Sequence, residues 1–210
     1  MRPVALLLIG PTGSGKTPLG NLLERKGLRG MRCRHFDFGA QLRRAAELAP
    51  DFTSLTAAEQ QVVRDALASN RLLAPEEFTI AAKILAEFLR SDTGWHRTLV
   101  ILNGLPRHVH QAVALEPLVD VPWLVHLHCT PETVRERIRR NWGGDRAGRS
   151  DDTEEAVARK LSIFAEQTLP LLAHYRHKGA HLIEIEVEVT STAESLLSRI
   201  EAESAIRICL

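Results

Sequence analysis

The chain has 210 residues, of which 44% are hydrophobic and 25% are charged, and its formal net charge is +1 at pH 7. These values are typical of one globular domain with a single core. The near-neutral charge excludes a general attraction to nucleic acid or to an anionic membrane, so we expect neither as a partner.

Short apolar runs alternate with helical patterns along the whole chain. In chain order, the sequence predicts a strand at 4–9, a helix at 18–27, a strand at 32–38, and helices at 39–48, 56–67 and 75–89. A strand at 98–102, a helix at 111–119, a strand at 123–129 and an arginine-rich helix from 130 follow. A helix at 153–175, bent or broken at Pro170, a strand at 181–189 and a helix from 192 complete the pattern. This alternation is typical of an α/β fold with a mostly parallel sheet.

Two features bear on the compartment. The apolar run at 4–9 is too short for a membrane span or a signal peptide. The three cysteines, Cys33, Cys129 and Cys209, are widely spaced and show neither a disulfide nor a metal-binding pattern, which favours a reducing compartment. We therefore expect a cytoplasmic protein, and a monomer.

The first strand leads directly into residues 10–17, Gly-Pro-Thr-Gly-Ser-Gly-Lys-Thr, with a helix behind them. This is the pattern G-x-x-x-x-G-K-T, in which backbone N–H groups and a helix N-terminus surround phosphate oxygens. Lys16 is expected to neutralise the β and γ phosphates, and the Thr17 hydroxyl to hold Mg²⁺. The residues predicted to bind ATP here are Gly13, Ser14, Gly15, Lys16 and Thr17.

Arginines follow the strands at the same end of the predicted sheet. Transfer of a phosphoryl group between nucleotides depends on positioning and on neutralising charge, which arginines supply. Arg107 follows the strand at 98–102, and Arg43 lies on the helix after the second strand. Further arginines crowd the segment 135–149, where a Gly-Gly pair suits a closing lid. For Arg135, Arg139 and Arg146 an exposed basic surface is the simpler interpretation.

With these motifs in this order, the chain resembles the adenylate kinase and UMP/CMP kinase family of nucleoside monophosphate kinases, in its short-lid form. "FGAQLRRA" resembles "TGDMLRxA", "LNGLPRHVHQA" resembles "LDGFPRTxxQA", and "GRSDDTEEAVARKL" resembles "GRxDDNxETxxxRL". The resemblance implies a three-layer α/β/α fold on a five-stranded parallel sheet, an NMP-binding insert near 39–70 and a lid near 141–152. It also implies that ATP phosphorylates a nucleoside monophosphate with Mg²⁺ as cofactor. AMP is the default acceptor, and CMP, UMP or a dNMP are alternatives.

The resemblance assigns roles to individual residues. Those it places at the acceptor are Phe38, Arg43, Gly104, Arg107 and Gln111. Those it places near the donor are Arg137 and Arg140, and the catalytic groups it implies are Lys16, Arg107, Arg149 and Lys160.

Four places depart from the family pattern. Thr17-Pro18 stands where the family commonly has Gly-Thr, and Phe38 and Ala40 replace the threonine and aspartate of "TGD". Lys160 replaces a second catalytic arginine. Asn103 replaces the aspartate that, in the family, holds Mg²⁺ mainly through water. Asn103 keeps an oxygen for Mg²⁺ but loses a negative charge, so we expect a slower or retuned enzyme. Asp37 is a new acid near the acceptor site, and a helix cap is the alternative interpretation.

Two other functions stay open. The first is a nucleotide-binding regulatory module with little turnover, which the changes at Asn103, Ala40 and Lys160 motivate. The second is a P-loop kinase of a non-nucleotide small molecule, with Asp37 as the anchor of its acceptor. Retention of the acceptor arginines favours a nucleotide acceptor.

Two histidine pairs, His108/His110 and His126/His128, also stand out. No acid or cysteine cluster at ligand spacing accompanies them, so we interpret them as structural rather than metal-binding.

Overall fold

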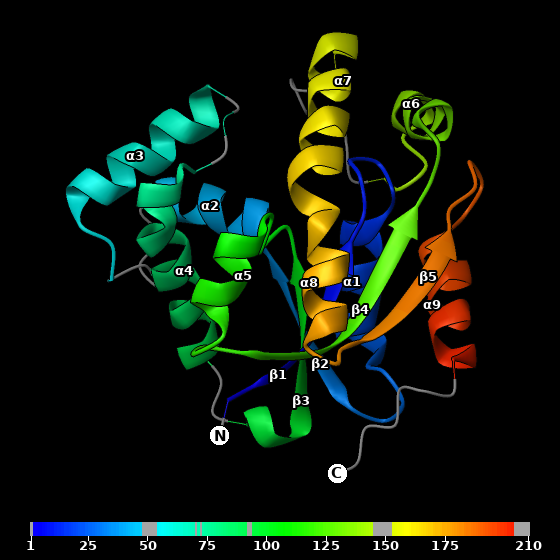
Figure 1. The fold of residues 1–210 in the computed structure, drawn as a ribbon, viewed down its shortest axis with the longest axis horizontal. Coiled ribbons are helices and arrows are strands. Elements are labelled where there is room, and N and C mark those ends of the chain that lie inside the picture. The colour runs from blue at the N-terminus through cyan, green and yellow to red at the C-terminus, as the bar shows by residue number, and fades with distance from the viewer. Residues whose placement is uncertain are drawn as a thin grey trace.

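The computed structural model describes residues 2–47, 54–69, 71, 73–91, 94–144 and 153–203. Its centre is a five-stranded parallel sheet with the strand order β2-β3-β1-β4-β5. The strands are β1 (Val4–Ile9), β2 (Arg32–Asp37), β3 (Thr98–Asn103), β4 (Asp120–His128) and β5 (His181–Glu186). The predicted α/β class and the five-stranded parallel sheet are confirmed (Figure 1).

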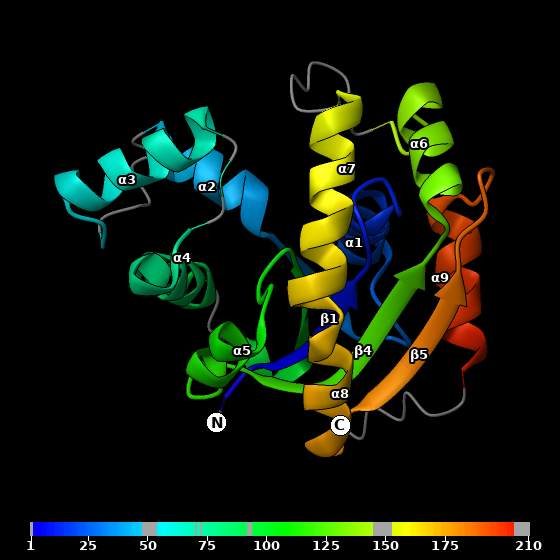
Figure 2. The same cartoon turned by 45° about the horizontal axis from the view of Figure 1, so that its top comes forward.

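Helices cover both faces of the sheet. They are α1 (Lys16–Lys26), α2 (Phe38–Ala46), α3 (Ala57–Ala68), α4 (Phe78–Arg90), α5 (Val109–Leu115), α6 (Pro131–Arg140), α7 (Glu154–Ile163), α8 (Pro170–His177) and α9 (Ala193–Ala202). Helices α1 and α9 pack on one face, and α4, α5 and α8 pack on the other (Figure 2). The three-layer arrangement is thus the predicted one.

The central strand β1 is buried on both faces because its side chains alternate between two cores. Ala5, Leu7 and Ile9 face the core under α4, α5 and α8, whereas Leu6 and Leu8 face the core under α1 and α9. A parallel strand covered by helices on both sides needs such a continuous apolar run. The run that predicted the strand is therefore also what fixes its central place.

Several elements differ in detail from the prediction; the strand expected at 181–189, for example, ends at Glu186. Strand β4 begins at Asp120, ahead of the expected position 123, and its pairing with β1 is irregular between Val4 and Leu6. Pro122 lies in this irregular part, where its missing N–H costs no regular ladder bond. The expected helix at 111–119 runs over Val109–Leu115. The expected interruption at Pro170 takes the form of a π-helical turn, Phe164–Thr168, between α7 and α8.

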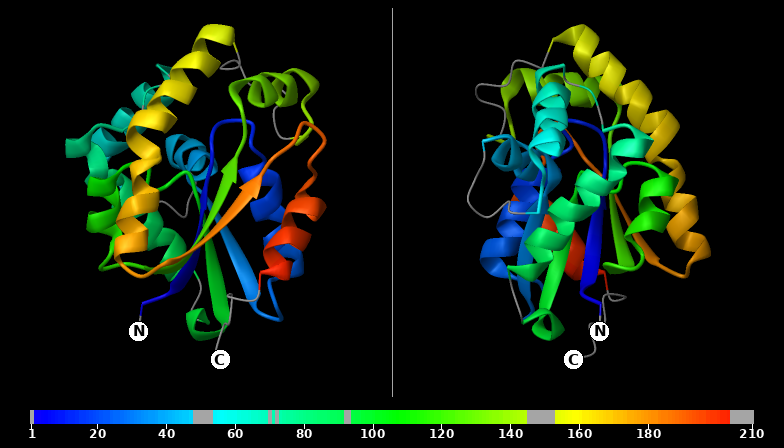
Figure 3. Two further views of the ribbon diagram at one scale, coloured as in Figure 1. Left: turned by 45° about the vertical axis from the view of Figure 1, so that its right-hand side comes forward. Right: turned by 90° about the vertical axis from the view of Figure 1, so that its left-hand side faces the viewer.

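The insert and the lid are described only in part. Helices α2 and α3 lie within the expected insert 39–70, but residues 48–53 and 70 lie outside the described residues. Of the expected lid 141–152, the structure describes residues 141–144. The turns after the carboxyl ends of the strands, with α6 and α7 beyond them, lie at one end of the molecule (Figure 3). Within the described ranges, no helix is long and apolar enough to cross a membrane.

Helix α1 packs closely on β2 through a glycine. Gly20 lies in the middle of α1, and a Cβ atom there would lie 2.3 Å from Nε2 of His35. The imidazole of His35 therefore occupies the space that a side chain on this face of α1 would need.

We expect Gly20→Ala to destabilise the protein. Overpacking a filled interior costs about 1–3 kcal/mol, and the gain in helix propensity is only about 1 kcal/mol. Urea unfolding should show a lower free energy of unfolding than that of the parent chain. Arg25→Ala, at an exposed position of the same helix, is the control, and an equal or higher stability of Gly20→Ala would contradict the packing described here.

Candidate active site

Three chain segments meet at the carboxyl edge of the sheet: the loop after β1 and the ends of β2 and β3. Asn103, the last residue of β3, pairs in register with Leu8 of β1 and with Asp37 of β2. In open parallel sheets this edge is where ligands bind. The phosphate loop and the departing residues Asp37 and Asn103 are therefore neighbours.

The phosphate loop, residues 10–17, has the conformation that its glycines permit. Gly13 and Gly15 have φ angles of +76° and +96°, which side chains with a Cβ rarely adopt. A Cβ at Gly10 would lie 2.6 Å from the Leu127 carbonyl oxygen, so no larger residue fits there. Helix α1 begins directly at Lys16 and directs its N-terminal N–H groups into the loop. The arrangement is suited to an anionic group such as a phosphate.

The Lys16 ammonium group is held at this loop. Its Nζ donates hydrogen bonds to the Gly10 and Pro11 carbonyl oxygens at 2.6 and 2.7 Å. A positive charge is therefore fixed beside the loop's N–H groups.

A hydrogen-bonded cluster joins Thr17, Asp37 and Asn103. The Thr17 hydroxyl donates to Asp37 Oδ2 at 2.7 Å. The Asn103 amide nitrogen donates to Thr17 Oγ1 and to Asp37 Oδ2, both at 3.0 Å. The cluster ties the phosphate loop to the ends of both neighbouring strands.

Asp37 has two roles at once. Its Oδ1 accepts from the Ala40 N–H at 2.9 Å and caps α2, while Oδ2 faces Thr17. Burial alone would raise the pKa of Asp37, but hydrogen bonds from Thr17 and Ala40 and the positive charge of Arg43 hold it below its usual value. The carboxyl group is therefore ionised at neutral pH. The helix-cap interpretation is confirmed, but it accounts for only one of the two oxygens.

His35 extends the cluster below the surface. Its Nδ1 lies 2.9 Å from Asn21 Oδ1 on α1, and its Nε2 lies 3.4 Å from the Asn103 amide nitrogen. Burial lowers the pKa of His35, against the charges of Asp37 and Glu24, so the ring is neutral at pH 7. With an amide oxygen at Nδ1, the proton belongs on Nδ1, and Nε2 accepts. Sequence reasoning missed His35 and Asn21, and the mid-helix Gly20 was the one signal of a close approach.

The segment after β3 carries Arg107 toward Asp37. Its Nε donates to the Gly104 carbonyl oxygen at 3.0 Å, and its backbone N–H donates to Gln111 Oε1 at 2.7 Å. Its carbonyl oxygen accepts from the Thr168 hydroxyl at 2.9 Å. Burial lowers the pKa of Arg107, and the nearby charge of Asp37 opposes this.

Arg43 also lies near this acid. A Cβ on Gly39 would lie 3.4 Å from Asp37 Oδ1 and 3.7 Å from Arg43 Nη1. Two arginines and one carboxylate therefore gather beside the phosphate loop. The roles expected for Gly104 and Gln111 at an acceptor stay predictions, although both contact Arg107.

Other predicted site residues lie in different surroundings. Phe38 is 5% exposed and stacks on Phe36 in the core, with ring centroids 6.1 Å apart. Arg140 is half exposed and pairs with Glu136. Lys160 is half-buried on α7. Arg149 lies outside the described residues, so its expected role stays a prediction like those of the other three.

Arg137 is buried, and its guanidinium group donates hydrogen bonds to backbone carbonyl groups. Its Nε donates to the Gly13 carbonyl oxygen at 2.9 Å, and its Nη1 lies 2.7–3.0 Å from the carbonyl oxygens of Glu188, Val189 and Ser191. It thus fastens the loop between β5 and α9 to the phosphate loop. A pocket of about 450 Å³ lies beside it, with Gly15, Trp142 and Thr192 among its lining residues. Its volume is in the range of small-molecule sites.

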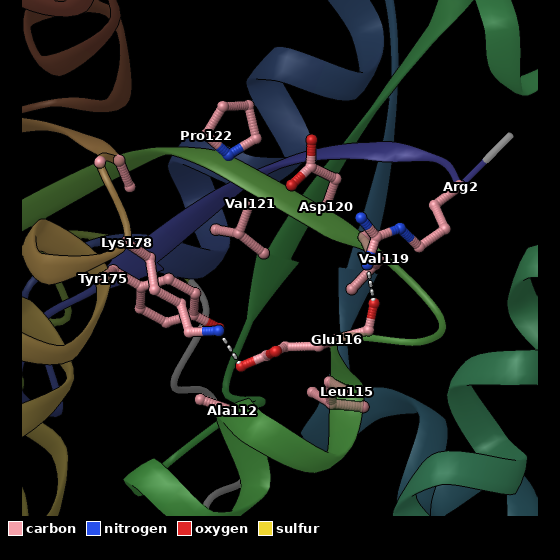
Figure 4. A pocket seen from close by; sticks show the side chains of 12 residues that line it. Arg2, Ala112, Leu115, Glu116, Val119, Asp120, Val121, Pro122, Tyr175 and Lys178 are labelled. Atoms are coloured by element: carbon pink, nitrogen blue, oxygen red, sulfur yellow. Dashed lines mark hydrogen bonds and ion pairs between the residues drawn. The ribbon is translucent and has the colours of Figure 1, made fainter.

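A second pocket, also about 450 Å³, lies at the opposite edge of the sheet. Lys178 and Glu116 form an ion pair in it, and Asp120 and Tyr175 line it (Figure 4). Asp120 is the first residue of β4, so this pocket lies at the amino ends of the strands. It is separate from the phosphate loop.

The histidine pairs form no metal centre in the described ranges. There, no group of three or more His, Cys, Asp or Glu side chains is placed to hold a metal ion. His108 caps α5, and His126 lies 3.5 Å from Glu184, next to the His128 ring. These contacts agree with the structural interpretation.

The chain is similar to known adenylate kinases over nearly its whole length, although no family model matches it. The adenylate kinase of Synechococcus sp. (strain WH7803) is 32% identical over 206 residues, which cover 95% of this chain and 98% of the relative. That of Synechococcus sp. (strain CC9311) is 32% identical over 203 residues, 93% of this chain and 96% of the relative. That of Rhodopirellula baltica is 29% identical over 179 residues, 83% of this chain and 82% of the relative.

We expect Arg137→Lys to lower the free energy of unfolding by roughly 2–4 kcal/mol. Lysine lacks the planar set of donors, so the backbone carbonyl groups that Arg137 binds lose charged partners. Urea unfolding would measure the loss. Arg139→Lys, on the exposed side of α6, is the matched control and should change stability by less than about 0.5 kcal/mol. Equal effects of the two substitutions would contradict the role given to Arg137.

We also expect His126 to make stability depend on pH. Burial lowers the pKa of His126, against the effect of Glu184, so below about pH 6.5 the unfolded chain binds a proton that the folded chain does not. The free energy of unfolding should therefore fall as the pH drops from about 6.5 toward the folded-state pKa, by up to about 1.4 kcal/mol per pH unit for this group.

His126→Gln should show a shallower slope in urea unfolding between pH 6.5 and 5. Val113→Ala, a substitution of an exposed side chain that does not titrate, is the control and should keep the parent slope. A parent-like slope for His126→Gln would show that this histidine titrates as it does in the unfolded chain.

Proposed function

The chain belongs to the adenylate kinase family, and on that premise we propose that it transfers the γ-phosphoryl group of ATP to AMP. Nearly full-length similarity to adenylate kinases carries this proposal. The site adds two physical supports: a phosphate loop with Lys16 fixed on it, and Arg43 and Arg107 beside Asp37. A purely binding module has no need of cations aimed at two phosphate groups at once. The predicted cytoplasmic location and monomeric state stay predictions.

The donor half of the site is the phosphate loop and the pocket next to it. The ATP phosphates would accept hydrogen bonds from N–H groups of residues 13–17, with the Lys16 ammonium turning from the loop carbonyl groups toward them. The donor base would enter the pocket of about 450 Å³ beside Arg137 and Trp142. Arg137 acts by holding the wall of that pocket, since its guanidinium binds backbone carbonyl groups.

The acceptor half lies on the other side of Asp37. Arg43 and Arg107 would bind the phosphate of AMP and hold its oxygen in line with the γ-phosphorus. The attacking group is that phosphate oxygen, so no side chain forms a covalent bond. Arg149 and Lys160 are proposed to neutralise the transferred group.

Mg²⁺ fits the chemistry of the site. Hydroxyl and carboxylate oxygens are the ligands that this cation prefers, and Thr17 and Asp37 present both at the end of the phosphate loop. When bound, Mg²⁺ would neutralise charge on the ATP phosphates.

The test is ADP formation from ATP and Mg²⁺ with AMP, GMP, CMP, UMP, their deoxy forms, or no acceptor. We expect turnover with AMP, and a loss of at least about 100-fold in Lys16→Ala, because this lysine stabilises developing charge. Asp120→Asn, an exposed acid at the far end of the sheet, should retain the parent rate.

Three outcomes would contradict the proposal. Turnover with CMP or UMP alone would reject AMP as the acceptor. ATP binding without turnover on any acceptor would favour the regulatory module. Turnover with only a non-nucleotide alcohol or acid as acceptor would favour a P-loop kinase of a non-nucleotide small molecule.

A further inference from the structure

We infer that Asp37 is the acid that positions Mg²⁺ in this protein, in place of the aspartate expected at position 103. The inference rests on the proposed function and concerns how the site is built. Position 103 carries an uncharged amide, while a carboxylate stands beside it on the neighbouring strand, in direct register. Compared with the family pattern, the negative charge lies at the end of β2 instead of at the end of β3.

The hydrogen bonds give this acid the required place. Asp37 Oδ2 accepts the Thr17 hydroxyl proton at 2.7 Å. Thr17 Oγ1 also accepts from the Asn103 amide nitrogen at 3.0 Å. A hydroxyl oxygen has two lone pairs, so with its proton directed to Asp37 and one lone pair toward Asn103, one lone pair remains for a cation. Asp37 therefore orients the group that would bind Mg²⁺ and supplies charge beside it.

Asn103 has the complementary role. A carboxylate only accepts, so the amide group must turn its nitrogen to Asp37 Oδ2, 3.0 Å away. The side chain is 5% exposed and is held there by Thr17 and Asp37. It is therefore a positioning residue for the acid and the hydroxyl.

The pair also explains why position 103 carries no acid here. With Asp37 present, a carboxylate at 103 would bring two negative oxygens to about the distance that now separates the amide nitrogen from Asp37, 3.0 Å. Two carboxylates so close cannot both ionise without a cation between them. One acid and one amide satisfy the same site without that repulsion.

The helix cap does not account for these contacts. Capping uses Asp37 Oδ1, which accepts from Ala40 N–H, and leaves Oδ2 to Thr17 and Asn103. Asparagine caps helices as well as aspartate does. Asp37→Asn therefore removes the charge while keeping the cap, and so separates the two roles.

The test measures binding of the non-hydrolysable analogue AMPPNP by calorimetry, once with Mg²⁺ and once with EDTA. The ratio of the two dissociation constants reports how much Mg²⁺ strengthens binding, without any turnover. The proteins are the parent chain, Asp37→Asn, Asn103→Asp, the double variant that combines these two substitutions, and the control Asp120→Asn. Asp37→Ser, which also keeps a capping oxygen, replaces Asp37→Asn if that variant fails to fold.

We expect Asp37→Asn to reduce the ratio by about 10-fold or more, the usual effect of losing a group that orients a metal ligand. Its affinity in EDTA should stay within about 2-fold of the parent. The double variant should show a ratio close to that of the parent chain, because it again has one acid and one amide at the two positions. Asn103→Asp should lower the melting temperature in EDTA, and Mg²⁺ should reverse the loss.

Any of the following results would overturn the inference: a parent-like ratio in Asp37→Asn, an equal loss of affinity with and without Mg²⁺, or a double variant no better than Asp37→Asn. A loss of AMP affinity beyond about 10-fold in Asp37→Asn, with an unchanged ratio, would place the acid at the acceptor instead and would overturn it too. Failure of the proposed function shows separately, as absence of AMP-dependent ADP formation by the parent chain.

Discussion

The hydrogen bond from the Thr17 hydroxyl to the Asp37 carboxylate is the contact on which the site depends. It is 2.7 Å long and joins the end of the phosphate loop to the end of β2, across the intervening strand β3. Asn103 at the end of β3 completes it by bonding to both partners. The loop, helix α2 and the sheet are therefore positioned by one small polar cluster.

A second fastening holds the other side of the phosphate loop. The buried guanidinium of Arg137 bonds to Gly13 and to the loop that leads into α9. The two fastenings have opposite chemistry: a half-buried acid binds the start of α1, and a buried cation binds backbone carbonyl groups. Between them, they hold the loop in the conformation that its glycines permit, next to the N-terminus of α1, which is suited to binding phosphate.

Most of the fold could be predicted from the sequence because it rests on local patterns. Apolar runs of strand length and threonines before helices, such as Thr56 and Thr192, marked the elements that the structure contains. The phosphate loop was predicted for the same reason, since its glycines and Lys16 are contiguous. The contacts of Asp37, Asn103 and His35 were not predicted, because they depend on β2 lying next to β3 in a fixed register. The burial of Arg137 was not predicted either, because the carbonyl groups it binds come from a distant loop.

The departures from the family pattern at positions 37 and 103 have one meaning along the sequence and another once the strands are paired in the sheet. Taken alone, an amide at position 103 is a lost charge, and an acid at position 37 is a helix cap. In the sheet they are side by side, and the hydrogen-bonding groups of each match those of the other. A parallel sheet presents the ends of its strands as one surface, so a charge needed on that surface can be carried by either of two neighbouring strands. The changes at the two positions therefore compensate each other, and they are consistent with a site that still transfers phosphoryl groups.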